Sequence, residues 1–353
     1  MKKELLTASA LAASLVVPGV ASAASMSMSG YSLNGITSND ADSSSDASYS
    51  ATQDSGMSIS VSETTDGGVT ISSGFTLVNE GATSATESGL TLTFTDGSSL
   101  ELIDAGTAYA GAMASVPSAS GEQGLGATSH NTSSTSLTWG SKTAAVGLDW
   151  NSAADFMGVE GLTFGVSAGL GDDATASTAT INTDSGFSVG ATYVTTAGDS
   201  TVTIGGGMVT SEGNSTNQSN ANSDSVALSA SVVTGDLTVG AGFSTGEGLA
   251  QEGSVSINEI DDVEVINVGA SYVSGDMTFT VSYKDGSVKS AELGTAAGTS
   301  TDSQEVVGAS VDYAVASGVT ATIGYENRDD TLNGAAVPTD SGGSIYLGAK
   351  ISF

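Results

Sequence analysis

The last eleven residues of the chain, GSIYLGAKISF at positions 343–353, decide its fold class. Every second residue of this stretch is apolar: Ile345, Leu347, Ala349, Ile351 and Phe353. The residues between them are Ser, Tyr, Gly, Lys and Ser. A period of two places alternate side chains on opposite faces of a β-strand. The segment is therefore predicted to be a strand with one apolar face and one face that is mostly small or polar.

The same alternation recurs along the chain, for example over 162–170 and 277–284. It predicts sixteen strands, near residues 26–36, 56–63, 69–79, 89–95, 99–105, 144–150, 161–170, 186–195, 201–211, 225–233, 237–244, 264–273, 277–284, 305–315, 319–327 and 343–353. The segment 135–140 could be another strand, but we assign it to a loop because a seventeenth strand would break the even number.

The links between these strands alternate between long and short. The predicted long links are 37–55, 80–88, 106–143, 171–185, 212–224, 245–263, 285–304 and 328–342. Several of the short links are Gly-Asp or Asp-Gly turns, which suit tight hairpins. An even strand number, with short turns at one end and long loops at the other, is typical of an antiparallel transmembrane β-barrel. We therefore predict an all-β, 16-stranded barrel.

Composition narrows the function. The chain has 353 residues and a formal net charge of −32, which argues against nucleic acid as a partner because phosphate binding needs clustered cations. It has no Cys and a single His, so disulfides, thiolate metal sites and a His-based zinc site are not expected. No segment after the first twenty-three residues offers the apolar length that a membrane helix needs.

The first twenty-three residues have the pattern of a secretory signal peptide. Lys2 and Lys3 precede the apolar run 5–17, and 21–23 reads Ala-Ser-Ala, a small-residue cleavage pattern. The alternative, an N-terminal membrane anchor, is disfavoured because the run is short and Pro18-Gly19 interrupts it. We expect residues 1–23 to be removed and 24–353 to form the barrel.

Three features carry a family resemblance: the opening stretch ASMSMSG at 24–30, the hairpin 89–106 followed by the longest loop, and the closing strand that ends in Phe353. In these the sequence resembles the general porins of Gram-negative bacteria, particularly the 16-stranded porins of alphaproteobacteria. The resemblance implies a homotrimer in the lipid of the bacterial outer membrane that passes ions and small hydrophilic solutes. It also implies that loop 106–143 folds inward and constricts the pore. The assembly machinery would read the closing strand at Leu347, Ala349, Ile351 and Phe353.

The alternation also predicts on which face of the wall each charged residue lies, because the face opposite the apolar residues must meet water. It places on the inner face Glu101, Asp149, Asp312, Glu326, Lys284 and Lys350. In or beside the constriction loop, the further candidates are Asp104, Glu122, His130 and Lys142. The excess of carboxylates predicts a cation-preferring pore.

Family constrictions set acidic loop residues against a basic cluster on the facing wall. This sequence departs from that pattern, because its cations after residue 23 are few and scattered: Lys142, Lys284, Lys289, Arg328 and Lys350. We therefore expect a weak transverse field.

The alternative function is an extracellular β-rich structural protein, such as an adhesin or a surface-layer component. An enzyme is not expected: the stretches 165–169 and 186–190 match the G-x-S-x-G pattern of hydrolases, but both lie in predicted strands without a His partner. No cofactor is expected either. The acidic pairs Asp40/Asp42 and Asp261/Asp262 could hold Ca²⁺ between loops, but EF-hand spacing is missing.

Overall fold

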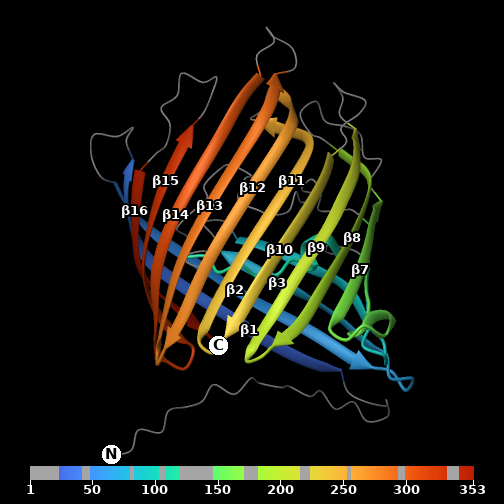
Figure 1. Cartoon of the computed structure of the whole chain (residues 1–353). Coiled ribbons are helices and arrows are strands. Elements are labelled where there is room, and N and C mark those ends of the chain that lie inside the picture. Colours follow the sequence, from blue (N-terminus) through green and yellow to red (C-terminus); the bar gives the residue numbers. More distant parts are fainter. Residues whose placement is uncertain are drawn as a thin grey trace, which may run out of the picture.

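The computed structural model describes residues 24–41, 48–79, 83–102, 108–119, 146–170, 182–214, 223–252, 256–292, 299–331 and 342–353. These residues form a closed barrel of sixteen antiparallel strands, in which each strand pairs with its neighbours in sequence and β1 pairs with β16 (Figure 1). The predicted fold class is confirmed.

The strands are β1 (Ser25–Ala41), β2 (Ser48–Thr64), β3 (Thr70–Asn79), β4 (Thr83–Thr93), β5 (Ser99–Leu102), β6 (Val146–Asn151), β7 (Leu162–Leu170), β8 (Asn182–Ala197), β9 (Ser200–Asn214), β10 (Ser223–Thr234), β11 (Leu237–Glu252), β12 (Ser256–Ser274), β13 (Met277–Glu292), β14 (Thr299–Ala316), β15 (Val319–Thr331) and β16 (Gly342–Ser352). Two short helical turns accompany them, α1 (Ala108–Gly111) and η2 (Phe156–Gly158). Within the described residues, no helix has the length and apolarity needed to cross a membrane.

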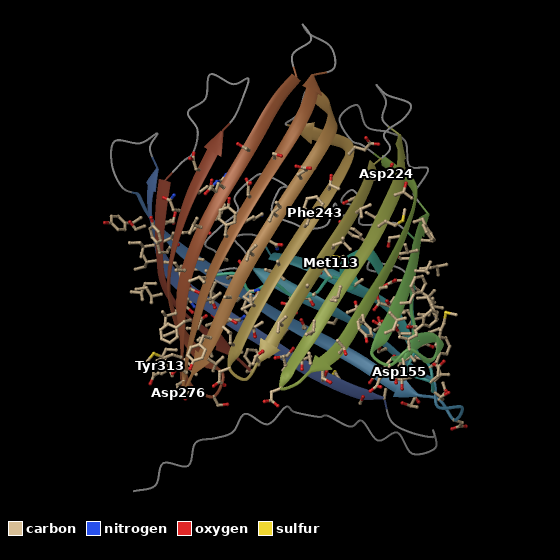
Figure 2. All side chains as sticks on the ribbon, in the orientation of Figure 1. Met113, Asp155, Asp224, Phe243, Asp276 and Tyr313 are labelled. Atoms are coloured by element: carbon tan, nitrogen blue, oxygen red, sulfur yellow. The ribbon has the colours of Figure 1, made fainter. Side chains whose placement is uncertain are left out.

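The outward face of the barrel is apolar and exposed. Leu347 and Ile351 of β16 keep 61% and 52% of their surface exposed, and large apolar side chains are exposed at alternate positions of most other strands. Figure 2 shows side chains of this kind projecting outward along both edges of the barrel. The inner face instead buries serine and threonine. This arrangement inverts that of a soluble protein and fits a wall that separates lipid from water.

Aromatic residues gather on the outward face near the short turns. Tyr313, beside the β14–β15 turn, is exposed and labelled at the lower end of Figure 2. Beside the β6–β7 turn, Phe156 of η2 stacks on Phe164 with ring centroids 5.4 Å apart, and its other neighbour is Trp150 at 6.1 Å. Amphipathic rings of this kind suit the boundary between lipid and water.

The strands extend further than the alternation predicts at the end that carries the predicted long links. β2 begins at Ser48 rather than near 56, and β11 continues to Glu252 rather than ending near 244. The predicted links 37–55 and 245–263 therefore shrink to 42–47 and 253–255. The physical reason is that backbone pairing continues where both faces are polar, so the side-chain signal ends before the ladder does.

The third link is the exception and spans 103–145. Only its residues 108–119 are among those described, so the segment 135–140 lies outside them. At the opposite end the short turns agree with the prediction, and the C-terminus lies at the same end (Figure 1).

Candidate functional site

Residues 108–119, with the sequence AYAGAMASVPSA, lie inside the barrel against its inner wall, and we call them the constriction segment. The Ala108 N–H donates to the Ser167 Oγ of β7 at 2.8 Å. The Ala119 N–H, at the other end, donates to the Ser282 Oγ of β13 at 3.0 Å. The segment thus runs along the inner wall from β7 to β13. The inward fold of loop 106–143 as a whole stays a prediction.

The middle of the constriction segment is held in the same way. The Ala114 N–H donates to the Ser229 Oγ at 2.6 Å, and the Thr192 hydroxyl donates to the Ala112 carbonyl at 2.8 Å. Side-chain hydroxyls of the wall therefore satisfy backbone groups that would otherwise be buried without partners.

Tyr109 anchors the segment through its side chain. It is fully buried and packs with Val209, Ala227 and Met113, and its hydroxyl lies 2.9 Å from the Ser225 Oγ. Figure 2 labels Met113 within the outline of the barrel, among the strands that carry these partners. A buried phenol with a satisfied hydroxyl gives the segment one defined position.

The two G-x-S-x-G matches have a structural use. Their serines, Ser167 and Ser188, lie on β7 and β8 with their hydroxyls 2.5 Å apart, and the Ser188 Oγ also accepts the Tyr109 N–H at 3.2 Å. Both motifs lie inside strands, as predicted. Their serines hold the constriction segment.

These contacts fix which face of each strand points inward. Ser167 pairs with Asp149 of β6, which pairs with Glu101 of β5, so both carboxylates share the inner face. Ser282 pairs with Gly308, which pairs with Glu326, and Lys284 lies two residues from Ser282. Alternation extends the same face to Asp312 and Lys350.

Glu101 and Asp149 form an acidic pair on β5 and β6, directly opposite each other in the ladder. Asp149 is only 6% exposed, and its Oδ2 accepts a hydrogen bond from the Asn151 amide at 3.1 Å. Its Oδ1 is buried and has no hydrogen-bond donor among the described residues. Two carboxylates side by side create a local negative potential at this wall.

The inner face of β13–β15 carries a mixed cluster. Lys284 interacts electrostatically with Glu326 and with Arg328, and Val306 separates Lys284 from Arg328 in the ladder. The prediction that Arg328 lies in the link 328–342 is wrong, because β15 continues to Thr331. The polar parity of Thr322, Gly324 and Glu326 continues to Arg328, but the opposite parity turns polar after Tyr325, so the apolar alternation ends before the strand does.

Lys350 lies near the seam between β16 and β1. Its Nζ is 5.3 Å from the centroid of the Tyr31 ring, and the Tyr31 hydroxyl donates to the Asp54 Oδ2 at 2.7 Å. Asp54 was predicted to lie in a loop, and this is wrong, because it belongs to β2. Its partner Leu33 on β1 also pairs with Lys350, so Asp54 and Lys350 lie on the same inner face. On β14, Asp312 accepts a hydrogen bond from Thr322.

Three of the cations that are scattered in sequence lie on one part of the described barrel wall. Lys284, Arg328 and Lys350 lie on β13, β15 and β16, and the acidic pair lies on β5 and β6, between five and eight strands away around the ring of sixteen. Opposite walls of the barrel therefore differ in charge. The expectation of a weak transverse field, which rests on few and scattered cations, stays a prediction.

Other candidates fall elsewhere. Asp104, Glu122, His130 and Lys142 lie outside the described residues. Within the described ranges, no group of three or more His, Cys, Asp or Glu side chains could hold a metal ion. In the closing strand, Leu347, Ile351 and Phe353 are exposed on the outward face, which Ala349 shares.

Comparisons with known proteins agree with the barrel fold. The family described as Gram-negative porin matches the chain over residues 7–333. Similar solved structures include OmpF of Salmonella typhi in complex with daunomycin, at 15% identity and a TM-score of 0.65, covering 93% of this chain and 98% of that one. An anion-selective porin from Comamonas acidovorans has 12% identity and a TM-score of 0.61, covering 94% and 100%.

A third similar structure is a trimer form of Vibrio cholerae OmpT that was folded in vitro. It has 16% identity and a TM-score of 0.54, and the match covers 94% of this chain and 100% of that one. At such identities the likeness shows the fold. A search of curated proteins finds none that matches this chain.

Proposed function

The chain belongs to the family of Gram-negative porins, and from that membership we propose that it forms a water-filled, cation-preferring channel for passive diffusion of ions and small hydrophilic solutes. Porins are channels of the outer membrane rather than enzymes. The observation that carries the proposal is the closed barrel with an apolar exterior, a hydroxyl-rich inner wall and the constriction segment seated against that wall.

Transport through such a channel needs no chemistry. A closed barrel satisfies its backbone hydrogen bonds within the wall, so it crosses the hydrocarbon region without an exposed strand edge. Serine, threonine and glycine on the inner face leave room for water, and the constriction segment narrows the space that solutes can use. Solutes then move down their own gradients.

The proposed cation preference rests on the inner-face charges. Among the residues placed there, the carboxylates Asp54, Glu101, Asp149, Asp312 and Glu326 outnumber the cations Lys284, Arg328 and Lys350. A lumen with an excess of carboxylates raises the local concentration of cations, and low-dielectric walls focus that potential. The same low dielectric strengthens the negative potential at Glu101 and Asp149.

The test is planar-bilayer recording of protein extracted from outer membranes, with the reversal potential measured across a salt gradient. We expect large stepwise conductances and a reversal potential signed for cations. Anion preference would retain the channel but reject the charge argument. Folded protein without any conductance would reject the channel itself.

We further propose that the channel is a homotrimer, and an outward polar island supports this. The Gln53 amide donates to the Asn34 Oδ1 at 3.3 Å, and the Asn34 amide donates to the Ser32 Oγ at 3.1 Å, all on the outward face of β1 and β2. Apolar Met28 and Ile36 flank this island on β1. Amides in contact with hydrocarbon are costly, whereas a neighbouring subunit offers them hydrogen-bond partners.

Two proposals concern biogenesis. Residues 1–23 would be removed on export, so N-terminal sequencing of protein from outer membranes should begin at Ala24, and a start at Met1 would contradict this. The assembly machinery would read the outward apolar residues of the closing strand together with Phe353. Deleting Phe353 should then reduce the amount of barrel that reaches the outer membrane in cells.

A further inference from the structure

A row of glycines lies on the inner wall beneath the constriction segment, one or two on each strand that contributes. They are Gly165 of β7, Gly190 of β8, Gly205 and Gly207 of β9, Gly240 of β11, Gly269 of β12 and Gly308 of β14. A Cβ atom added at any of them would come within 3.1 Å of an atom of the segment. The segment therefore lies in direct contact with the wall, at positions where only glycine leaves space.

The order of the contacts follows the order of the strands. Gly165 faces Ala108, Gly205 faces the Ala112 carbonyl, and Gly240 faces Ser115 and Val116. Further round the barrel, Gly269 faces the Pro117 carbonyl, and Gly308 faces Ala119. The segment thus runs around the wall from β7 to β14, one strand after another. We call these seven glycines the glycine track.

The serines beside the track complete the seat. Ser167, Ser188, Ser229 and Ser282 each accept a backbone N–H of the segment, from four different strands. The glycines lack the side chains that would hold the segment away from the wall. The serine hydroxyls provide hydrogen-bond acceptors for its backbone N–H groups at the surface of the wall. Together they allow the segment to lie flat with its buried N–H groups satisfied.

We infer that the glycine track determines the size selectivity of the channel, because it sets how far the constriction segment projects from the wall. This inference rests on the proposed function. The segment is a fixed part of the lining, and its exposed residues Ala110, Gly111, Ser115 and Ser118 are small and uncharged. This side of the constriction therefore limits solutes by size, while the charges act from the walls.

The first test adds a single methyl group beneath the segment. In Gly269→Ala the new Cβ would lie 1.8 Å from the Pro117 carbonyl oxygen, and in Gly205→Ala it would lie 2.0 Å from that of Ala112. Ordinary contact begins at 3.4 Å. The wall is held by hydrogen bonds on both sides of each strand, so the segment is what moves, and it moves into the lumen.

The expected result is a narrower channel. In liposome-swelling assays with sugars of increasing size, uptake of the largest permeant sugar should be lost in both variants, while the smallest sugar still enters. The matched control is Gly67→Ala in the β2–β3 turn, away from the segment, because a Cβ there meets only the Thr65 hydroxyl at 3.9 Å. Gly269→Ala and Gly205→Ala variants with the size limit of wild type and of this control would overturn the inference.

A second measurement does not depend on transport. The Cβ of Ala119 lies 3.1 Å from a Cβ built at Gly308, near the separation of about 3.5–4.5 Å found in disulfides, and the chain has no cysteine. The double variant Ala119→Cys with Gly308→Cys should form this bond on oxidation of the folded barrel. Pairing Ala119→Cys with Thr37→Cys on β1 gives a control that should not.

The disulfide result and the conductance of wild type distinguish the position of the segment from the porin function. If wild type conducts and the locked disulfide variant keeps its conductance, the segment occupies its seat in the working channel. If the variant forms a channel but the Ala119→Cys/Gly308→Cys pair stays reduced, the segment does not lie on the glycine track, and the inference is rejected while the porin function is retained. A wild type that forms no channel would reject the porin function, and the disulfide would still decide where the segment lies. If the glycine variants do not fold, the disulfide pair alone determines whether the segment lies on the track.

Discussion

Phe353 and Gly30 exchange two backbone hydrogen bonds of 2.9 Å each, which join the last residue of the chain to β1. The Phe353 ring also covers Gly30, since a Cβ added to this glycine would lie 2.6 Å from the ring and 2.8 Å from the Gly56 carbonyl oxygen. The seam of the barrel therefore depends on a terminal aromatic residue and on a glycine that accommodates it.

We expect Gly30→Val to destabilise this seam by roughly 1–3 kcal/mol, as overpacking does elsewhere. The measurement is the temperature at which the folded barrel converts to the slower, unfolded band on SDS gels. Gly67→Ala, whose Cβ would meet only the Thr65 hydroxyl at 3.9 Å, is the control. Equal midpoints for Gly30→Val and Gly67→Ala would show that the seam does not depend on Gly30.

Neutralising the acidic pair should weaken cation preference. Glu101→Gln with Asp149→Asn keeps the shape of both side chains and removes two negative charges from the inner wall. The reversal potential across a salt gradient should shift towards zero or towards anions. Asp66→Asn, in the exposed β2–β3 turn, removes a charge away from the lumen and should leave the potential unchanged. A shift of equal size in both variants would mean that overall charge, and not the pair, sets the preference.

Removing a cation from the facing wall should act in the opposite direction. Arg328→Gln retains polar hydrogen-bonding capacity and leaves Glu326 with Lys284 as its basic neighbour. The channel should become more cation-selective in the same reversal-potential measurement. An unchanged potential would mean that Arg328 does not contribute to the field that permeant ions experience.

The outward amides distinguish a subunit contact from a lipid contact. If a neighbouring subunit covers Asn34 and Gln53, replacing both with Leu should lower the thermal stability of the trimer on SDS gels, by about 1 kcal/mol for each lost polar contact. If lipid covers them, the same change should raise stability, because two amides leave hydrocarbon. Val281→Leu on β13 is an outward control.

Acid should affect one of the short turns. The Ser98 hydroxyl and the Ser98 N–H donate to the Asp96 carboxylate at 2.7 and 3.0 Å, and these bonds lower the pKa of Asp96 below its ordinary value of 3.8. A lowered pKa in the folded state adds stability above the ordinary value, and this stability is lost as the pH falls through the lowered pKa.

The variant Asp96→Asn should therefore be less stable than wild type at neutral pH, and the difference should shrink as the pH falls through the lowered pKa of Asp96. Urea titrations of the refolded barrel at several pH values measure this. A difference that does not vary with pH would assign the effect to the turn geometry rather than to the charge.

Much of the fold could be predicted because lipid and water face opposite sides of one wall. That constraint imposes the alternation of Leu347, Ala349 and Ile351 with Tyr346, Gly348 and Lys350, and it repeats on every strand. The strand number and the inward parity of Glu101 and Asp149 follow from it. The prediction failed at Asp54 and Arg328, where strands continue beyond the apolar band and side-chain alternation no longer marks them.

The constriction segment shows what could not be predicted. Its sequence AYAGAMASVPSA has neither a strand period nor a charge, and the glycines and serines that seat it come from eight strands, β7 to β14. From the sequence, Ser167 and Ser188 are two of many small polar residues on the inner face. Only the strand register shows that their hydroxyls lie 2.5 Å apart beneath the segment.

The sequence by itself determined the barrel, because the alternation within each strand marks which face meets lipid. The tertiary structure alone decided which inner residues oppose one another and where the segment lies. Closing a ring of sixteen strands brings β16 beside β1 and sets β5 opposite β13. Such separations depend on strand order around the ring and not on distance along the chain.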